Sequence, residues 1–220
     1  MKSTLFKLSS PIFEVVDKDY QIFDEVYSIP TLSAYAILNH YIQRTNTVAA
    51  EIDYIPDYEL LENTLRVKRV KPALQGELRI CLLTLIYADI RDYGLLSPHI
   101  NDPDLKQRLG QFAEEADNAF QGGAWMSFTI MAISVIEGLL FNIFGRKNLS
   151  KLIDMASNNS IINEKEKDLL HNARKVRNRI HAGQFKKPLA DRCTGTDLYV
   201  LYDQLLKKEW MIIKNSSKNI

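Results

Sequence analysis

One stretch of the chain constrains the fold more than any other: residues 124–144 read AWMSFTIMAISVIEGLLFNIF. If this stretch is a helix, apolar side chains lie on every face of it. They must be buried on all sides, either by the rest of the domain or by a second subunit. Its length approaches that of a bilayer span, but polar residues interrupt it and its flanks lack the charge asymmetry of a membrane anchor. We therefore expect a buried core or interface helix, with no membrane as partner.

Helix start and stop signals surround this stretch. Asp102 and Pro103 predict a helix start, and Gly122-Gly123 a helix end. Asn163, followed three residues later by Glu166, predicts a capping box. The expected helices span residues 102–121, 124–144, 149–159, 163–183 and about 196–210.

The first part of the chain is harder to read. Apolar spacing predicts a helix over 31–44 with Thr31 as N-cap, and a long helix over 72–94 that begins at Pro72. A short helix and a strand are expected between them, and short strands over 11–29. We therefore expect an all-α protein whose N-terminal region is mostly helical with a few short strands. The expected divisions are 1–98, a helical domain 99–212 and a flexible tail 213–220.

Composition excludes several classes of protein. A formal net charge of +1 excludes a wholly basic protein, so any anion binding must come from a local patch. The two cysteines are far apart, and the N-terminus lacks the apolar run of a signal peptide, which favours free thiols in a reducing cytoplasm. The scattered His40, His99 and His171 have no metal-ligand spacing, and no phosphate-binding glycine loop is present. We expect neither a metal nor a cofactor.

Residues 174–183, RKVRNRIHAG, concentrate cations just before a glycine. At about 100° per residue a helix sorts them into two stripes. The expected core stripe holds Leu169, Ala173, Val176 and Ile180. The expected polar stripe holds Arg174, Arg177, Asn178 and His181. Cations near a helix C-terminus often only offset the helix dipole. The functional alternative is a site for phosphate. A histidine is the residue whose charge can change near neutral pH, as acid–base catalysis requires, and two arginines beside it can bind the phosphate.

Glu137 lies in the middle of the apolar helix. A buried carboxylate without a partner is costly, so a cation should meet it, and the cluster 174–179 is the dense supply of cations in this region. A contact between Glu137 and one of these arginines is expected. Partial exposure and pairing elsewhere are the alternatives.

Two segments together resemble a known family. FAEEADNAFQGGAWMSFTIMAISVIEGLLFNIF, followed by KLIDMASNNSIINEKEKDLLHNARKVRNRIHAG, is similar to the HEPN domain, a helical module with an R-x(4–6)-H motif near the end of a late helix. The resemblance covers about residues 103–210. It implies a metal-independent endoribonuclease that acts as a dimer, often in toxin–antitoxin, abortive-infection or CRISPR-linked defence.

The resemblance also implies roles for particular residues. His181 takes the histidine position and Arg174 the arginine position, with Asn178 and Glu137 as supporting residues. The family often has asparagine directly after the motif arginine, which here is the pair Arg177-Asn178. Only three residues separate Arg177 from His181, one short of the usual spacing, so either arginine can be the motif residue.

The expected function is therefore cleavage of RNA, with the 2′-hydroxyl attacking the adjacent phosphate at a cleft between two subunits. The expected homodimer forms through residues 124–144 and the motif helix, and an antitoxin or another protein is a further expected partner. One alternative is a non-catalytic HEPN-like module for dimerisation, nucleotide binding or protein docking. A helical DNA-binding regulator is the other, disfavoured by the balanced charge.

Overall fold

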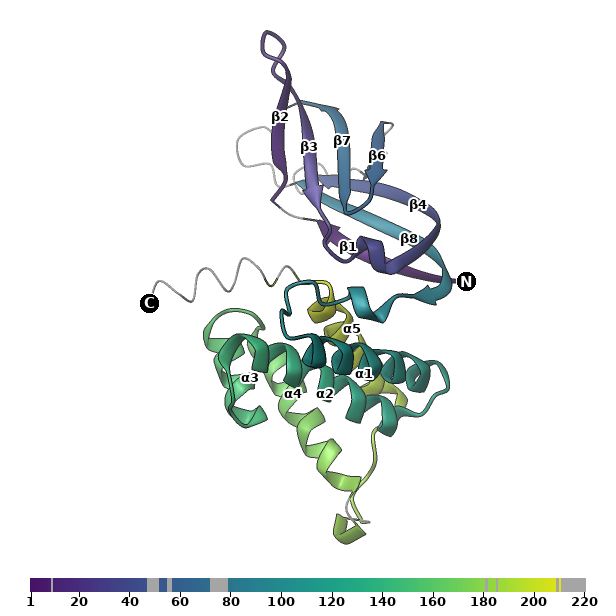
Figure 1. The fold of residues 1–220 in the computed structure, drawn as a ribbon, viewed down its shortest axis with the longest axis vertical. Helices are drawn as coiled ribbons and strands as arrows, with labels where there is room; N and C mark the ends of the chain where they lie inside the picture. The colour runs from purple at the N-terminus through teal and green to yellow at the C-terminus, as the bar shows by residue number, and fades with distance from the viewer. Residues whose placement is uncertain are drawn as a thin grey trace. The chain divides into compact units, whose positions relative to one another are not determined.

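The structure is a computed structural model, and it describes residues 1–8, 10–46, 52–54, 57–71, 79–180, 182–184, 186–208 and 210. The chain divides into two compact units, Met1–Leu95 and Leu96–Ile220. The first unit is built from β-strands and the second from α-helices (Figure 1). The expectation of an all-α protein is therefore wrong, and so is that of a mostly helical N-terminal region: the fold is mixed α and β.

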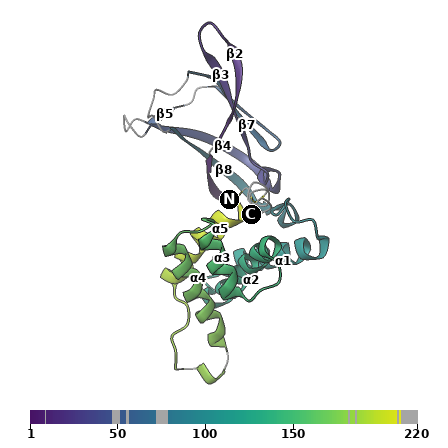
Figure 2. The ribbon, with the colours of Figure 1, turned by 90° about the vertical axis from the view of Figure 1, so that its left-hand side faces the viewer.

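In its described residues the β unit contains two antiparallel sheets of four strands each. One sheet has the order β1 (Lys2–Leu8), β8 (Arg79–Arg91), β4 (Tyr35–Asn46) and β5 (Ile52–Tyr54). The other has the order β2 (Ile12–Asp17), β3 (Ile22–Ser28), β7 (Thr64–Val70) and β6 (Tyr58–Leu61) (Figures 1 and 2). Two short 3₁₀ turns, η1 (Leu32–Ala34) and η2 (Tyr93–Leu95), belong to the same unit.

Strands β4 and β8 replace the two helices expected over 31–44 and 72–94. Along β8 every second side chain is buried, namely Cys81, Leu83, Leu85 and Tyr87, and the residues between them are partly exposed. That alternation is the period of a strand, and pairing with β4 satisfies the backbone groups of both strands. Thr31 precedes η1 and its side chain makes no capping hydrogen bond. Pro72 lies outside the described residues.

The other expectations for this unit had mixed outcomes. The strands expected over 11–29 are confirmed as β2 and β3. The expected strand between the two supposed helices is also present, as β5, β6 and β7. Among the described residues 52–54 and 57–71 there is no helix, so the expectation of a short helix there finds no support.

Apolar side chains from both sheets form the core of the β unit, and the ion pair of Glu25 with Arg44 crosses between the sheets. Glu25 on β3 is 4% exposed. Its carboxylate meets the guanidinium of Arg44 on β4 and accepts a hydrogen bond of 2.9 Å from the Tyr27 hydroxyl. Burial, followed by the charge of Glu25, raises the pKa of Tyr27, so the phenol stays a donor.

Strand β2 is an edge strand, and its apolar side chains are exposed on both of its faces. Ile12 is 69% exposed, Phe13 58% and Val15 54%. Pro11 precedes the strand, and the register to β3 shifts between Val15 and Asp17, which marks a bulge.

The helical unit contains α1 (Pro103–Gln121), α2 (Trp125–Phe144), α3 (Leu149–Asn158), α4 (Glu164–Arg177) and α5 (Arg192–Leu206). Helix α2 packs against each of the other four helices, and half of its most apolar window is buried within the unit. Of the two alternatives that the sequence left open, a core helix and an interface helix, the packing of α2 within its unit supports the core helix. Among the described residues, α2 is also the one helix long and apolar enough to cross a membrane by length and composition.

Several local signals place these helices. The Asp102 side chain accepts from the backbone N–H groups of Asp104 and Leu105, and the predicted capping box of Asn163 and Glu166 is present. Gly145, at φ 74°, caps α2, which ends at Phe144 as the range 124–144 predicts. Helix α5 begins earlier than predicted, because Asp191 caps it through the Thr194 N–H, and it ends at Leu206.

Candidate functional site

The basic cluster begins on α4 and continues past the end of that helix. Helix α4 ends at Arg177, and Asn178 caps it, its N–H donating to the carbonyls of Arg174 and Val176. A 3₁₀ turn, η3 (Asn178–Ile180), follows, and after it η4 (Ala182–Gln184). The expected helix through Gly183 is therefore wrong, and helical geometry relates only Arg174 and Arg177. His181, the predicted catalytic residue, lies outside the described residues.

The core-facing side of α4 differs from the predicted stripe. Leu170, Ala173 and Val176 are buried, whereas Leu169 is only partly buried. Ile180 is 56% exposed, because the chain leaves the α-helix before reaching it. The predicted stripe was correct for Ala173 and Val176, wrong by one residue at its start, and wrong for Ile180 at its end.

Glu137 and Arg177 form the contact that the sequence predicts between α2 and the cluster. The Arg177 Nη1 donates to Glu137 Oε2 over 2.8 Å. The Arg177 side chain is 33% exposed and the Glu137 side chain 34%. Glu137 is therefore both paired with an arginine and partly exposed, two outcomes that the sequence analysis treated as alternatives. A pair this open to water contributes at most about 1 kcal/mol to stability. Its main effect is to fix the direction of the Arg177 guanidinium.

The other cations of the cluster have different surroundings. Arg179 donates from Nη1 to the Pro188 carbonyl over 2.6 Å, a contact that sequence reasoning missed. Lys175 is exposed. Arg174 is partly buried, and its Nε is shielded from solvent without an acceptor among the described residues.

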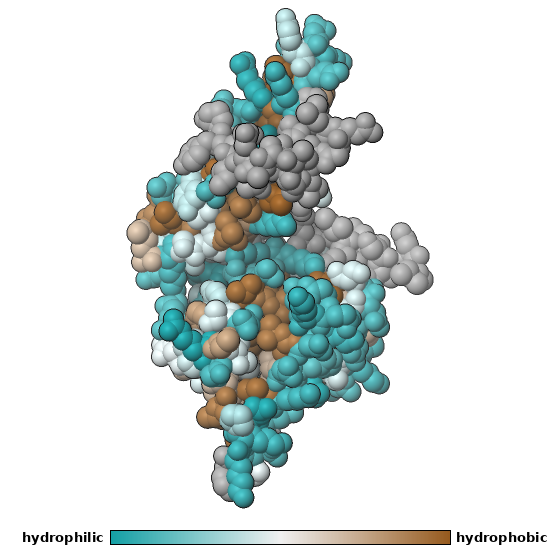
Figure 3. All heavy atoms as spheres, turned by 180° about the vertical axis from the view of Figure 1, so that it is seen from behind, coloured by the Kyte–Doolittle hydropathy of each residue, from teal (hydrophilic) through white to brown (hydrophobic). Residues whose placement is uncertain are grey.

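Positive charge is strongly concentrated around this cluster. Residues 172–192 hold seven lysines and arginines against one aspartate, a net charge of +6, which leaves −5 for the rest of a chain of net charge +1. Lys186, Lys187 and Arg192 thus extend the cluster that the sequence singled out. The end of α4 and the turns after it lie beyond the ends of the other helices (Figures 1 and 2), and the tip is hydrophilic on the face seen in Figure 3.

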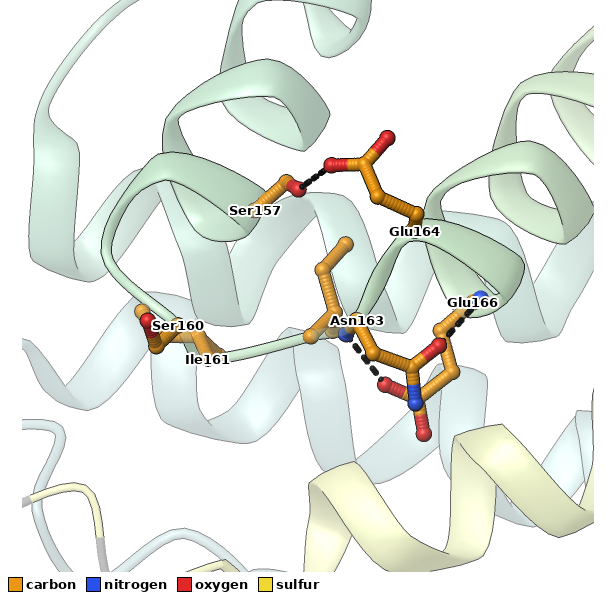
Figure 4. A pocket seen from close by; sticks show the side chains of 7 residues that line it. Ser157, Ser160, Ile161, Asn163, Glu164 and Glu166 are labelled. Atoms are coloured by element: carbon orange, nitrogen blue, oxygen red, sulfur yellow. Dashed lines mark hydrogen bonds between the residues drawn. The ribbon is translucent and has the colours of Figure 1, made fainter.

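A surface depression of about 430 Å³ lies elsewhere, between α3 and α4 (Figure 4). Ser157, Asn163, Glu164 and Glu166 in its lining make contacts within the chain. The Ser157 hydroxyl donates to Glu164 over 2.6 Å, and the Asn163 N–H donates to Glu166 over 2.7 Å. Asn163 and Glu166 form the capping box of α4, and Ser157 at the end of α3 binds the first residue of α4, so these contacts account for the depression. The part of the chain that the structure describes holds no group of three or more side chains suited to a metal.

Similarity to known proteins does not identify the chain. No family model, no curated protein and no solved structure matches it.

Proposed function

We propose that the helical unit binds RNA through residues 172–192 and cleaves it without a metal, as a cytoplasmic homodimer of HEPN type. The observation that carries the proposal is the net charge of +6 on one short segment of an almost neutral chain. Such a segment attracts a polyanion through phosphate contacts and counterion release. Guanidinium groups suit phosphate, because their planar array of donors matches two phosphate oxygens.

In the proposed reaction the 2′-hydroxyl attacks its own adjacent phosphorus. A base removes the 2′-proton, the bond to the 5′-oxygen breaks, and an acid protonates that leaving oxygen. His181 serves as one of these two groups, and the second copy in a dimer supplies the other. Arg174 and Arg177 offset the charge that develops on the phosphate, and Asn178 supports the site from the turn η3. The products are a 2′,3′-cyclic phosphate and a 5′-hydroxyl.

A partly exposed stripe on α2 supports the homodimer. Ile130, Ser134, Glu137 and Phe141 share one side of the helix at helical spacing, and Phe141 is 40% exposed. A second copy seated there would cover apolar surface and bring two basic clusters near one another. The β unit is the proposed contact for an antitoxin or another protein partner.

Cleavage of RNA in the presence of EDTA tests the catalytic part of the proposal. His181→Ala is expected to lower the cleavage rate by about 100-fold or more, the usual contribution of a general acid or base. Lys151→Ala, which removes an exposed cation on α3, is the control and should cleave at the wild-type rate. Equal cleavage by the His181→Ala protein would refute the assigned role.

The second candidate function is an RNA- or nucleotide-binding module without catalysis. The contact between Arg177 and Glu137 favours it, because a carboxylate already occupies part of that guanidinium. Binding that weakens steeply with salt, together with no cleavage by the wild-type protein, would identify this function.

A further inference from the structure

Aromatic side chains gather where the turn between α1 and α2 meets the first turns of α5. Phe120, near the end of α1, stacks on Tyr199 of α5 at a ring centroid distance of 4.1 Å. Trp125, the first residue of α2, meets the Phe120 ring edge-on at 5.5 Å. These three rings are partly exposed and rest on Phe128 and Tyr202, which are both 0% exposed. Phe120, Trp125 and Tyr199, called here the aromatic ledge, are therefore the outer layer of an aromatic cluster.

The two tryptophans of the chain have opposite surroundings. Trp210 is 1% exposed, and its indole N–H donates to the Leu205 carbonyl over 2.9 Å, as expected for a tryptophan of the core. Trp125 is partly exposed, and its indole N–H keeps contact with solvent and meets no acceptor in the described part of the chain. A tryptophan whose ring is partly open and whose polar group is free is suited to contact a ligand.

Gly195 fixes the position of the Trp125 ring. A Cβ at position 195 would lie 2.9 Å from Trp125 Cε3, so the indole lies directly on the backbone of α5. Phe120 contacts the same ring from α1. Because the ring is already held by two elements, a ligand that stacks on it restricts little further side-chain motion, which favours binding.

Positive charge leads to the ledge along α5. Arg192 is the exposed first residue of α5 and the last residue of the segment 172–192, whose net charge is +6. Tyr199 follows it after two helical turns, so the two positions share one side of the helix, about 10 Å apart along its axis. Basic side chains on the phosphates and aromatic rings on the bases are together the way in which proteins bind single-stranded nucleic acid. A strand whose phosphates contact the segment 172–192 therefore brings a base within reach of the ledge.

We infer that the aromatic ledge binds a base of unpaired RNA, which stacks against the exposed part of Trp125. This inference rests on the proposed function for RNA as the ligand, and it adds a contact with a base to a site that otherwise contacts phosphates. It also specifies the substrate class. A base inside a duplex is covered by its neighbours, so the ledge requires a single strand or a loop. Every base has a ring face, so the ledge accepts many sequences.

The first test compares two oligonucleotides with the full chain, by fluorescence anisotropy. One is a single-stranded 2′-O-methyl RNA that cannot be cleaved, and the other has the same length but carries no bases. Trp125→Leu is expected to bind the RNA about tenfold or more weakly than wild type, as the loss of a base stack does. It should bind the base-free strand within about twofold of wild type, because the phosphate contacts remain, and this result also shows that the variant is folded.

Two further variants complete this comparison. Trp125→Phe keeps an aromatic ring and should recover most of the RNA affinity that Trp125→Leu loses. Val200→Ala is the matched control, since it shortens an apolar side chain that is 53% exposed on another side of α5, and it should bind both strands as wild type does.

A second test separates this inference from the proposed function. In a protein with isotope-labelled tryptophan, the two indole N–H groups are followed by NMR while adenosine or ribose phosphate is added. Adenosine should shift the Trp125 signal and leave the Trp210 signal in place, and ribose phosphate should shift neither. This result supports the ledge even if the wild-type protein binds no RNA, in which case only the proposed function fails. A Trp125 signal that adenosine does not move, or an equal loss of affinity for both strands in Trp125→Leu, would overturn the inference.

Discussion

Glu25 and Arg44 form an ion pair between the two sheets of the β unit, and the substitution Glu25→Gln measures what that pair contributes to stability. The glutamine keeps the size of the side chain and an acceptor for the Tyr27 hydroxyl, so the main change is the lost charge. The guanidinium of Arg44 then stays in a site where its side chain is only 11% exposed.

The expected loss is large for one substitution. At an effective dielectric constant of about 20, two unit charges about 4 Å apart attract by about 4 kcal/mol. Removing one partner of a buried pair costs about 3–5 kcal/mol, since the other charge is left without compensation. Arg44 also has an Nε without an acceptor in the described part of the chain, so that donor does not offset the loss.

Hydrogen exchange measured by mass spectrometry is the suitable assay, because it reports each unit separately. Amides of β3, β4 and β8 should exchange faster by the factor that corresponds to 3–5 kcal/mol, roughly 150- to 5,000-fold. Both tryptophans, Trp125 and Trp210, lie in the helical unit, so their fluorescence should report an unchanged unfolding midpoint.

A matched control is Glu14→Gln. Glu14 pairs with Arg66 at 2.6 Å, but its side chain is 50% exposed, so a change below about 1 kcal/mol is expected. If Glu25→Gln has no greater effect than Glu14→Gln, the argument from burial is wrong. In the triple variant Glu25→Leu, Arg44→Leu and Tyr27→Phe, most of the stability should return, because well-packed apolar residues replace such pairs at little cost and no buried hydroxyl loses its acceptor.

Two further predictions concern thiol chemistry and helix packing. Burial raises the pKa of Cys81 to about 11, so its thiol stays protonated at pH 8. Iodoacetamide should therefore modify the exposed Cys193 first and reach Cys81 only after unfolding. Equal modification rates of the two cysteines, measured by mass spectrometry, would contradict this prediction. A Cβ at Gly138 would lie 2.3 Å from Leu109 Cδ2, so Gly138→Ala should destabilise the helical unit by about 1–3 kcal/mol in a tryptophan-monitored urea titration. Gly183→Ala, where a Cβ meets nothing within 4 Å, should leave the midpoint unchanged.

The sequence allowed the helical unit to be predicted well, because its signals are local. Asp102 with Pro103 and Asn163 with Glu166 act within one helical turn, so the residues that form each cap are visible in the sequence. The contact of Glu137 with Arg177 was predictable because a lone carboxylate in an apolar helix requires a cation. The end of α4 was not predictable, because Gly183 offered a stop signal and nothing local marks the earlier stop at Arg177.

The β unit was mispredicted because its determinants are non-local. In β8, consecutive apolar residues such as Leu82 and Leu83 fit a helical period as well as a strand period. What selects the strand is pairing with β4, where Leu83 lies opposite Ile42, about 40 residues earlier in the chain. Such a partner is invisible within either segment alone. The same limit applies to Glu25 and Arg44, which stand on different strands and reveal their contact only when the sheets are assembled.

The exposed strand β2 restricts how this sequence can vary over evolution. An apolar strand on the outside of a sheet is a template on which further copies can add, which is how ordered aggregates begin. Pro11 lacks an N–H, and the bulge between Val15 and Asp17 interrupts the row of backbone groups, so only a short run is open to such addition. Substitutions that straighten the strand would lengthen that run. Selection for solubility therefore acts on residues that contribute nothing to the core.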